Sequence, residues 1–408
     1  MKMLNWTQSF SIFLFLDSNN YQSQPGRYRW LLGADTVYQI KGQDILTEIY
    51  QDHSQSKDWL FGHFSYELRT ELEPGLPSQK PPVQQNPSSF FCPRFVLWLD
   101  TEYILTIESA AGSAASIYEL ISATTEPEVK PLPSVKFRPL VSKPEYQQAV
   151  EAIRMHIKEG DCYELNYCAG GSAVTRDLQP LQAFLTLNSL SPAPYAALYR
   201  QDALHLLCAS PERYLYKSAN QLVSQPIKGT ARRAADAGED EQRRTALQQS
   251  VKDRAENVMI VDLVRNDLAR SSKVGSVHVE ELFGIYSFPQ VHQMISTVCS
   301  TIREDLPFTD SIRYSFPMGS MTGAPKIKVM ELIDKYEVCS RDLFSGSVGY
   351  INPAGDFDFN VIIRSLFYNK STGLLYYQTG GAITYDSDPE EEYEEMRLKA
   401  WALERIFE

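Results

Sequence analysis

Lys228 stands in the segment QPIKGT (225–230), between the rigid Pro226 and the permissive Gly229. A lysine amine acts as a nucleophile only when it is neutral, so its pKa must fall from about 10.4 towards about 7–8 through desolvation or nearby charge. A lysine beside a glycine more often lies in a solvated loop. A chemical role for Lys228 therefore depends on the side chains that the rest of the chain brings to it.

Two helical segments each carry a pair of acids one turn apart. Asp253 and Glu256 open a predicted helix over 252–270, and Glu392 and Glu395 lie near the C-terminus. Two such pairs would form a magnesium site if they converged, because Mg²⁺ takes a few carboxylates and leaves positions for water or substrate oxygens. The alternative is that the acids only stabilise the positive ends of their helices.

The C-terminal helix is predicted to start at Asp388-Pro389, an N-cap followed by a proline in the first turn. Glu392 lies about 60° from the centre of the apolar face, so it flanks the buried side. Glu395 and Lys399 are four residues apart and can form a simple helical ion pair. The apolar face consists of Tyr393, Met396, Ala400, Leu403 and Phe407.

Two further charged residues stand beside apolar segments. Glu212 precedes a predicted strand; near an apolar interior its pKa would rise and it would serve as a proton donor, although pairing with Arg213 is the commoner arrangement. Arg364 interrupts the apolar run of a predicted strand over 360–366. Because arginine is rarely buried without an anion, Arg364 is a candidate carboxylate ligand.

The segment GSMTGAPK (319–326) resembles a phosphate loop but lacks the spacing of one. A Walker A loop has four residues between its glycines and a lysine directly after the second, whereas three residues intervene here and Ala-Pro displaces the lysine. We predict a glycine-rich turn that leads into a helix near Pro325. Its free amides would hold a carboxylate or another anion, and a purely structural turn is the alternative.

The elements around these residues indicate an α+β fold with large, mostly antiparallel sheets and flanking helices. Strands are predicted over 10–16, 28–32 and 95–99, and a capped helix over 142–159. The charged stretch 231–249 is predicted to be a mobile link. A Pro- and Glu-rich stretch around 124–139 places a domain boundary there, giving a β-rich segment over 1–135 and a catalytic domain over 136–408.

Composition excludes several classes of function. A net charge of −12 argues against nucleic-acid or anionic-membrane surfaces, and no apolar run is long enough to span a membrane. The six cysteines form no CxxC pair and have no histidine nearby in the sequence, so neither a zinc site nor a disulfide framework is predicted. We expect a cytoplasmic protein, in which an anionic substrate would need a local cationic cage or a bridging metal. The cysteines are Cys92, Cys162, Cys168, Cys208, Cys299 and Cys339.

Seven segments in order resemble the chorismate-utilising enzymes, and the resemblance is dense over 140–408. This family includes anthranilate synthase component I, aminodeoxychorismate synthase component I, and the isochorismate and salicylate synthases. Thinner similarity in FLDS (15–18), GRYRWL (27–32) and SYEL (65–68) suits the two component I groups. The seven segments are SPERY (210–214), PIKGT (226–230), DRAENVMIVDLVRNDLAR (253–270), GSMTGAPK (319–326), GSVGYI (346–351), DFDFNVIIRSL (356–366) and SDPEEEYEE (387–395).

Two positions separate the reactions within this family. Anthranilate synthases usually have alanine where this chain has Lys228, so the lysine resembles the aminodeoxychorismate synthases. Isochorismate and salicylate synthases place a water-activating lysine where this chain has Glu164, so water should not be the nucleophile here. Component I enzymes more often have glutamine at that position, and Glu164 is a departure. Phe344 is another, since anthranilate synthases often have a tyrosine contact there.

The resemblance implies a role for each candidate residue. Lys228 would attack the chorismate ring while Glu212 protonates the departing hydroxyl, and ammonia would then displace the lysine. The remaining residues would hold the metal and the substrate. Mg²⁺ would be bound by Glu256 and Glu392, with Asp253 and Glu395 behind through water, and chorismate by Thr230, His292, Arg364, Gly380, Gly381 and Lys399.

The resemblance also implies a reaction and a partner. The product would be 4-amino-4-deoxychorismate, on the route to p-aminobenzoate and folate, with ammonia supplied by a separate glutamine amidotransferase subunit. Anthranilate synthase component I is the nearest competing assignment, and Lys228 is the feature against it. A non-catalytic ligand-binding subunit and a nucleotide-binding enzyme are two more distant hypotheses. The fold implied is a sandwich of two sheets, as in anthranilate synthase component I.

Overall fold

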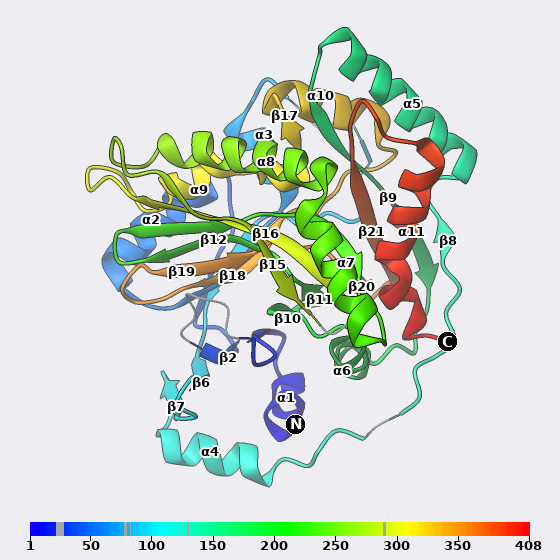
Figure 1. Cartoon of the computed structure of the whole chain (residues 1–408). Helices are drawn as coiled ribbons and strands as arrows, with labels where there is room; N and C mark the ends of the chain where they lie inside the picture. The colour runs from blue at the N-terminus through cyan, green and yellow to red at the C-terminus, as the bar shows by residue number, and fades with distance from the viewer. Residues whose placement is uncertain (22–27, 77–79, 82, 129, 289–290) are drawn as a thin grey trace.

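The computed structural model describes the chain except residues 22–27, 77–79, 82, 129 and 289–290. Two large sheets, A and B, form the centre of the molecule, and all of the described strand pairs are antiparallel (Figure 1). Helices cover their outer faces and ends. The predicted α+β architecture with large antiparallel sheets and flanking helices is therefore confirmed.

Sheet A contains strands from both ends of the chain. From one edge to the other it runs β17 (Gly323–Ala324), β9 (Glu164–Val174), β21 (Leu374–Ile383), β20 (Ser365–Asn369), β11 (Leu204–Ser210), β10 (Tyr195–Gln201), β1 (Ile12–Asp17), β2 (Tyr28–Ala34), β6 (Phe95–Asp100) and β7 (Leu105–Ser109), and β8 (Arg138–Pro139) pairs with β9.

Sheet B likewise contains strands from both the N-terminal and the C-terminal parts of the chain. It runs β14 (Ile227–Arg232), β16 (Val291–Thr301), β13 (Gln221–Gln225), β12 (Arg213–Ser218), β19 (Phe357–Asn360), β18 (Ser347–Ile351), β4 (Leu60–Phe64), β5 (Ser89–Cys92) and β3 (Tyr38–Ile40), and β15 (His278–Ser287) pairs with β16.

Both sheets combine strands from either side of residue 135. In sheet A, β1 pairs along its length with β10, so that Phe15 lies opposite Leu198. In sheet B, β4 pairs with β18. The predicted boundary lies between α4 (Ala114–Ala123) and β8, where the described residues form no helix or strand. The division into two domains stays a prediction.

The main apolar core lies between the two sheets. Leu14 and Leu31 of sheet A and Phe61 and Phe359 of sheet B belong to one buried cluster. A second cluster fills the outer face of sheet A beneath α1 (Lys2–Trp6), α4, α6 (Pro180–Leu190) and α11 (Pro389–Arg405). A third lies beneath α5 (Lys143–Glu159) and α10 (Lys326–Tyr336). The remaining helices are α2 (Ile45–Ser56), α3 (Arg69–Leu72), α7 (Ala237–Gln249), α8 (Val251–Ala269) and α9 (Asp310–Ser315), with single turns η1 (Thr7–Ser9), η2 (Tyr66–Leu68) and η3 (Gly319–Met321).

Local sequence signals fix the ends of the predicted helices. Ser142 caps α5 in a reciprocal arrangement with Glu145, and Gly160 ends it with a φ of 87°. Asp388 caps α11 by accepting hydrogen bonds from the amides of Glu390 and Glu391. The turn over 319–326 leads into α10, as predicted. No helix in the described part of the chain is long and apolar enough to cross a membrane.

The prediction of a mobile link over 231–249 is wrong. Strand β14 continues to Arg232, and residues 237–249 form α7. Asp236 caps this helix by accepting a hydrogen bond from the amide of Glu239, whose side chain pairs with Arg243 at 2.6 Å. The charged stretch is rich in good helix formers, and its high charge reflects a helix that lies mostly in solvent.

Candidate active site

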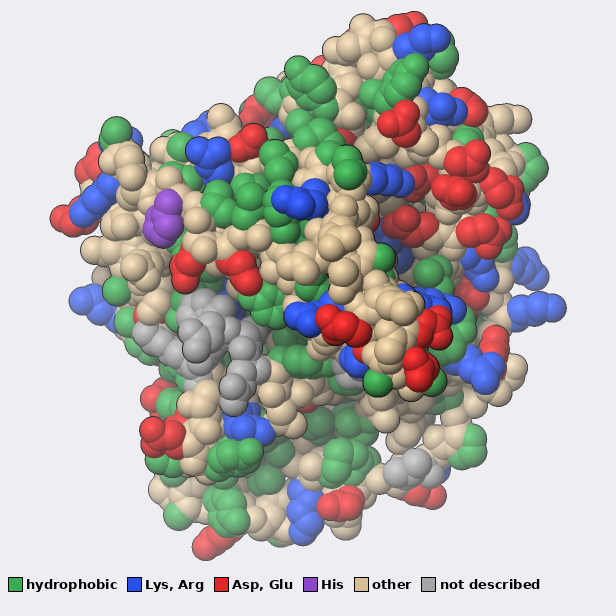
Figure 2. Space-filling model, viewed as in Figure 1, with side chains coloured by type: hydrophobic (Ala, Val, Ile, Leu, Met, Phe, Trp, Pro, Cys, Tyr) green, Lys and Arg blue, Asp and Glu red, His purple; other side chains and the backbone are tan. Residues whose placement is uncertain are grey.

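One large cavity, of about 940 Å³, lies where the edges of both sheets meet α8 and α11. Figure 2 shows acidic and basic side chains together on this face of the molecule, near the positions of α7, α8 and α11 in Figure 1. Nearly all of the residues singled out from the sequence line it. They are Glu212, Lys228, Thr230, Asp253, Glu256, Phe344, Arg364, Gly380, Gly381, Glu392, Glu395 and Lys399.

Lys228 is the second residue of β14 and is buried, with 9 % of its surface exposed. Its ammonium group donates a hydrogen bond to Glu164, the first residue of β9, which is 2 % exposed. Gly229 follows with a φ of 89°, and a Cβ atom there would lie 2.9 Å from the Asp253 carboxylate. Glycine is thus required both by the backbone conformation and by the close approach of α8. Lys228 is held between two sheets and a helix.

The structure indicates the charge of Lys228, which the sequence left open. Burial favours the neutral amine, but the negative charges of Glu164 and Glu256 outweigh it and raise the pKa of Lys228 above its ordinary value. The lowered pKa that attack by a neutral amine requires is therefore not found in the resting protein. The sequence showed neither how close Glu164 lies nor that it is buried, because the two residues are 64 positions apart.

Glu212 lies just before β12, in the same cavity. Burial raises its pKa to about 7, against the lowering effects of Ser320 and of the Lys228 charge. Arg213 does not neutralise it, because the guanidinium binds Asp358 at 2.9 Å on the neighbouring strand. A carboxyl group that is about half protonated at neutral pH suits general acid catalysis.

The two acid pairs predicted from helical spacing face the same cavity from α8 and α11. Burial raises the pKa of Glu256 to about 7 and also raises the pKa of Glu392, whose carboxylate accepts a 2.7 Å hydrogen bond from Ser387. Glu395 differs: the nearby Lys399 ammonium, at 2.7 Å, lowers its pKa to about 2. The ion pair between Glu395 and Lys399 that the helical spacing allows is therefore present, and both residues also line the cavity.

These acids fit a hard divalent cation. In the described part of the chain, Glu256 and Glu392 form no ion pair with a lysine or arginine. Burial makes their negative charges energetically unfavourable, and a bound cation would compensate them. Gly381 leaves room for the Glu392 carboxylate, since a Cβ atom there would lie 3.0 Å from one of its oxygens. The four acids do not form a tight set: in the described residues, no three of them bring donor atoms within 4.8 Å of one another.

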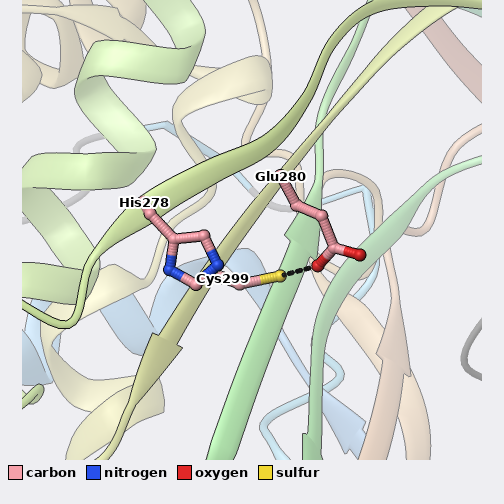
Figure 3. Close-up of side chains that lie close together, drawn as sticks. All are labelled: His278, Glu280 and Cys299. Atoms are coloured by element: carbon pink, nitrogen blue, oxygen red, sulfur yellow. Dashed lines mark hydrogen bonds between the residues drawn. The ribbon is translucent and has the colours of Figure 1, made fainter.

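A set of potential metal donors does occur away from the cavity. Figure 3 shows His278 and Glu280 of β15 beside Cys299 of β16, whose thiol donates a 2.9 Å hydrogen bond to Glu280. The spacing of the cysteines in the sequence does not show this neighbour, because it is antiparallel pairing that places His278 directly opposite Cys299. None of the three residues lines the cavity.

Arg364 lines the cavity and adopts a left-handed backbone conformation, with a φ of 51°. This conformation is strained for a residue with a side chain and is often found where function requires it. Burial lowers the pKa of Arg364, and the charge of Glu395 opposes that effect. Nearby, the Lys399 ammonium donates a 2.7 Å hydrogen bond to the carbonyl of Gly380. Arg364 and Lys399 are thus two of the cationic side chains in the cavity wall that are able to meet an anionic ligand.

His292 is not among the residues that line the cavity, and the substrate contact stays a prediction. Its Nδ1 forms a 2.8 Å hydrogen bond with the hydroxyl of Ser287, and its Nε2 forms a 3.1 Å hydrogen bond with the carboxylate of Asp240 in α7. Successive residues of a strand point to opposite faces, so Val291 and Gln293 of β16 face the cavity and His292 faces away. His292 instead anchors α7 against sheet B.

Lys252 and Gln293 are among the polar residues of the cavity wall that sequence reasoning missed. Lys252 stands one position before Asp253, and its charge lowers the pKa of Glu256, Glu392 and Glu395. Alternation along β16 would have found Gln293 once its register was known.

Comparison with known proteins identifies related sequences. The family model for chorismate binding enzymes matches residues 18–405. The chloroplastic aminodeoxychorismate synthase of Arabidopsis thaliana is 36 % identical over 364 residues, which are 84 % of this chain and 39 % of that protein. Aminodeoxychorismate synthase component 1 of Escherichia coli (strain K12) is 39 % identical over 255 residues, 62 % of this chain and 56 % of that protein. The chain thus spans less than two thirds of the length of these relatives.

Solved structures share the fold. Anthranilate synthase component I from Streptococcus pneumoniae TIGR4 superposes with a TM-score of 0.81 at 23 % identity, covering 95 % of this chain and 94 % of that one. At this level of identity the similarity concerns architecture, and it includes the two-sheet sandwich predicted from the motifs. The match over nearly the whole sequence, with the motifs gathered around one cavity, shows that the chain belongs to the chorismate-binding enzyme family.

Proposed function

We propose that the chain combines chorismate with ammonia to form 4-amino-4-deoxychorismate. The observation that carries this proposal is the pairing, in one cavity, of the buried Lys228 with Glu212, whose pKa is raised to about 7. One residue supplies a nucleophile and the other an acid. The relatives named aminodeoxychorismate synthase support the same reaction.

The reaction begins with attack by the neutral Lys228 amine on the ring carbon next to the one that bears the ring carboxylate. The bond between C4 and the hydroxyl oxygen breaks, and Glu212 donates its proton so that the oxygen leaves as water. Ammonia then forms a bond to C4 while the bond to the lysine nitrogen breaks. The ammonium group formed at C4 gives a proton to Glu212, which is thereby ready for another turnover.

Cations around the cavity would orient the substrate. Arg364, Lys399 and the backbone at Gly380 and Gly381 would bind the pyruvyl side, and Thr230 stands at the exposed end of the wall. Glu256 and Glu392 would hold Mg²⁺, with Asp253 and Glu395 behind through water. When bound, Mg²⁺ would neutralise and fix the ring carboxylate.

We further propose that a glutamine amidotransferase subunit supplies the ammonia, since the relatives named component 1 imply a second component. A cytoplasmic location and a role on the route to p-aminobenzoate and folate stay predictions of the same proposal. Free ammonia should replace the partner in vitro.

The test is a product assay with the purified chain, chorismate, Mg²⁺ and ammonium, read by mass spectrometry. We expect aminodeoxychorismate; anthranilate or isochorismate would refute the proposal. The variant Lys228→Ala should lose this product because it lacks the nucleophile. Arg265→Ala, on the solvent-facing side of α8 where the guanidinium pairs with Asp262 of the same helix at 2.7 Å, is a matched control that should retain it.

A further inference from the structure

Glu164 is the side chain in closest contact with the proposed nucleophile. It begins β9 and lies opposite Ala324 of β17, so sheet pairing fixes its backbone beneath the cavity. One carboxylate oxygen accepts the hydrogen bond from Lys228. The other oxygen is buried and has no hydrogen-bond partner in the described part of the chain. Glu164 does not itself line the cavity, so it meets the reaction only through Lys228.

The resting arrangement poses a chemical problem, because an ammonium group has no lone pair with which to attack. The proton must leave Lys228 before a carbon–nitrogen bond can form. Within the described residues, Glu164 is the acid that makes an ion pair with Lys228. Glu164 is therefore the candidate acceptor for this proton.

The other charged groups around Lys228 have different tasks or partners. Glu212, beside β12, must carry its own proton to act as the acid. From α8, Asp253 and Glu256 are assigned to the metal, and Lys252 adds a positive charge. From α11, Glu395 is paired with Lys399. Arg364 lies beside β20, and the wall also carries Arg232, Arg233, Glu392 and Glu394.

We propose that Glu164 accepts the proton of Lys228 before the attack and returns it after the lysine is displaced. This inference rests on the proposed function, because it assigns a proton acceptor to that reaction. The proton moves from the lysine nitrogen to the contacting carboxylate oxygen, leaving a neutral amine and a neutral acid. Desolvation penalises both charged partners, so a closed, dry cavity favours this neutral arrangement more than water does.

The proton count closes over one turnover. Lys228 begins as an ammonium, Glu164 as a carboxylate and Glu212 as a carboxylic acid. After the transfer, the lysine forms its bond to carbon and Glu212 protonates the departing hydroxyl. Ammonia then displaces the lysine as a neutral amine, which takes back the proton from Glu164. The product ammonium group returns a proton to Glu212, so chorismate and ammonia have become aminodeoxychorismate and water.

The shape of the pH–rate profile tests this transfer. In the wild type, the Lys228–Glu164 pair holds one proton before and after the transfer, so Lys228 activation requires no loss of a proton to solvent. In Glu164→Gln the lysine must lose its proton to solvent. With the Glu164 charge gone, burial lowers the pKa of Lys228 against the weaker raising effects of Glu256 and Glu212 alone. We expect the variant to gain an acidic limb that the wild type lacks.

The pKa of Lys228 in the Glu164→Gln variant sets the expected loss of turnover. If its pKa in the variant lies at about 7–8, turnover at pH 6 falls about ten- to hundred-fold relative to the wild type, and the gap narrows towards pH 8. Glu164→Asp keeps a carboxylate and should keep the wild-type profile. Free ammonia is held constant across the pH range, and thermal unfolding of each variant checks that the fold is retained.

A second measurement needs no turnover. The rate at which a small amine-reactive reagent modifies Lys228, followed by mass spectrometry against pH, reports the pKa of this lysine directly. We expect Glu164→Gln to be modified at least about tenfold faster than the wild type at neutral pH, because a change of one pKa unit is tenfold in free amine.

Failure of the inference and failure of the proposed function are distinguishable. If the wild type forms no aminodeoxychorismate, the proposed function fails. If the wild type forms it and Glu164→Gln has the same profile shape and the same Lys228 modification rate, the role of Glu164 is overturned while the function stands.

Discussion

Breaking the buried ion pair between Lys228 and Glu164 should cost stability as well as activity. The variant Lys228→Met leaves a carboxylate that is 2 % exposed without its cation, and one of its oxygens already has no partner in the described structure. Removing one partner of a buried pair typically costs about 3–5 kcal/mol, because the remaining charge stays desolvated. Lys228→Met should therefore lower the free energy of unfolding by about that amount.

The double variant Lys228→Met/Glu164→Gln removes both charges, and replacing both partners of a buried pair by neutral side chains costs little. We expect it to regain at least about 2 kcal/mol of the loss, which appears as a coupling energy in a double-mutant cycle. Neither variant should form aminodeoxychorismate, so stability returns while activity does not.

Urea unfolding followed by circular dichroism measures this cycle, provided that all variants share the same slope. Lys273→Met is the matched control, since Lys273 pairs with Glu304 at 2.7 Å on the surface, where the ammonium side chain is 45 % exposed. Its unfolding midpoint should hardly change, because solvent screens exposed pairs. The reasoning is refuted if Lys228→Met unfolds at the wild-type midpoint, or if the double variant is no more stable than Lys228→Met.

Three further predictions concern the cavity. Glu212→Gln should lower turnover by about 10²- to 10⁴-fold. Wild-type turnover should decline as pH rises through about 7, because Glu212 must be protonated to act as the acid and its pKa is raised to about 7. A pH–rate profile without this decline would contradict the role of Glu212. Gly229→Ala should destabilise the protein by about 1–2 kcal/mol, because φ is 89° and the new methyl group would crowd α8, and a thermal shift measures the loss. Glu256→Gln should raise the Mg²⁺ concentration needed for half-maximal activity, whereas the exposed Glu391→Gln should not, and equal Mg²⁺ titrations for the two variants would exclude Glu256 as a ligand.

Much of the local structure could be predicted because its causes are local. The capping signals at Ser142 and Asp388 and the stop at Gly160 lie within a few residues of the helix ends that they fix. The mobile link was mispredicted because the same charged residues suit a solvent-exposed helix, here α7, and only its cap at Asp236 distinguished the two. Short-range signals thus predicted most helices and strands, but they did not distinguish helix from loop at every position.

Nearby residues in the sequence do not determine which face of a sheet a strand residue points to. His292 faces α7 while its neighbour Gln293 faces the cavity, and the sequence does not contain the register that decides between them. In the same way, Cys299 meets His278 only because β15 and β16 pair in one particular alignment. Predictions that rest on residue type fail where orientation depends on pairing.

The sequence by itself determined which chemical groups this protein has: one lysine beside a glycine, a carboxyl group before a strand, and two acid pairs at helical spacing. The tertiary structure decided how they act together. Folding two sheets and two helices around one cavity placed Lys228 against Glu164, which makes the resting lysine an ammonium rather than a free amine. The charge of a buried group depends on which neighbours share its low-dielectric surroundings, and only the folded chain selects those neighbours.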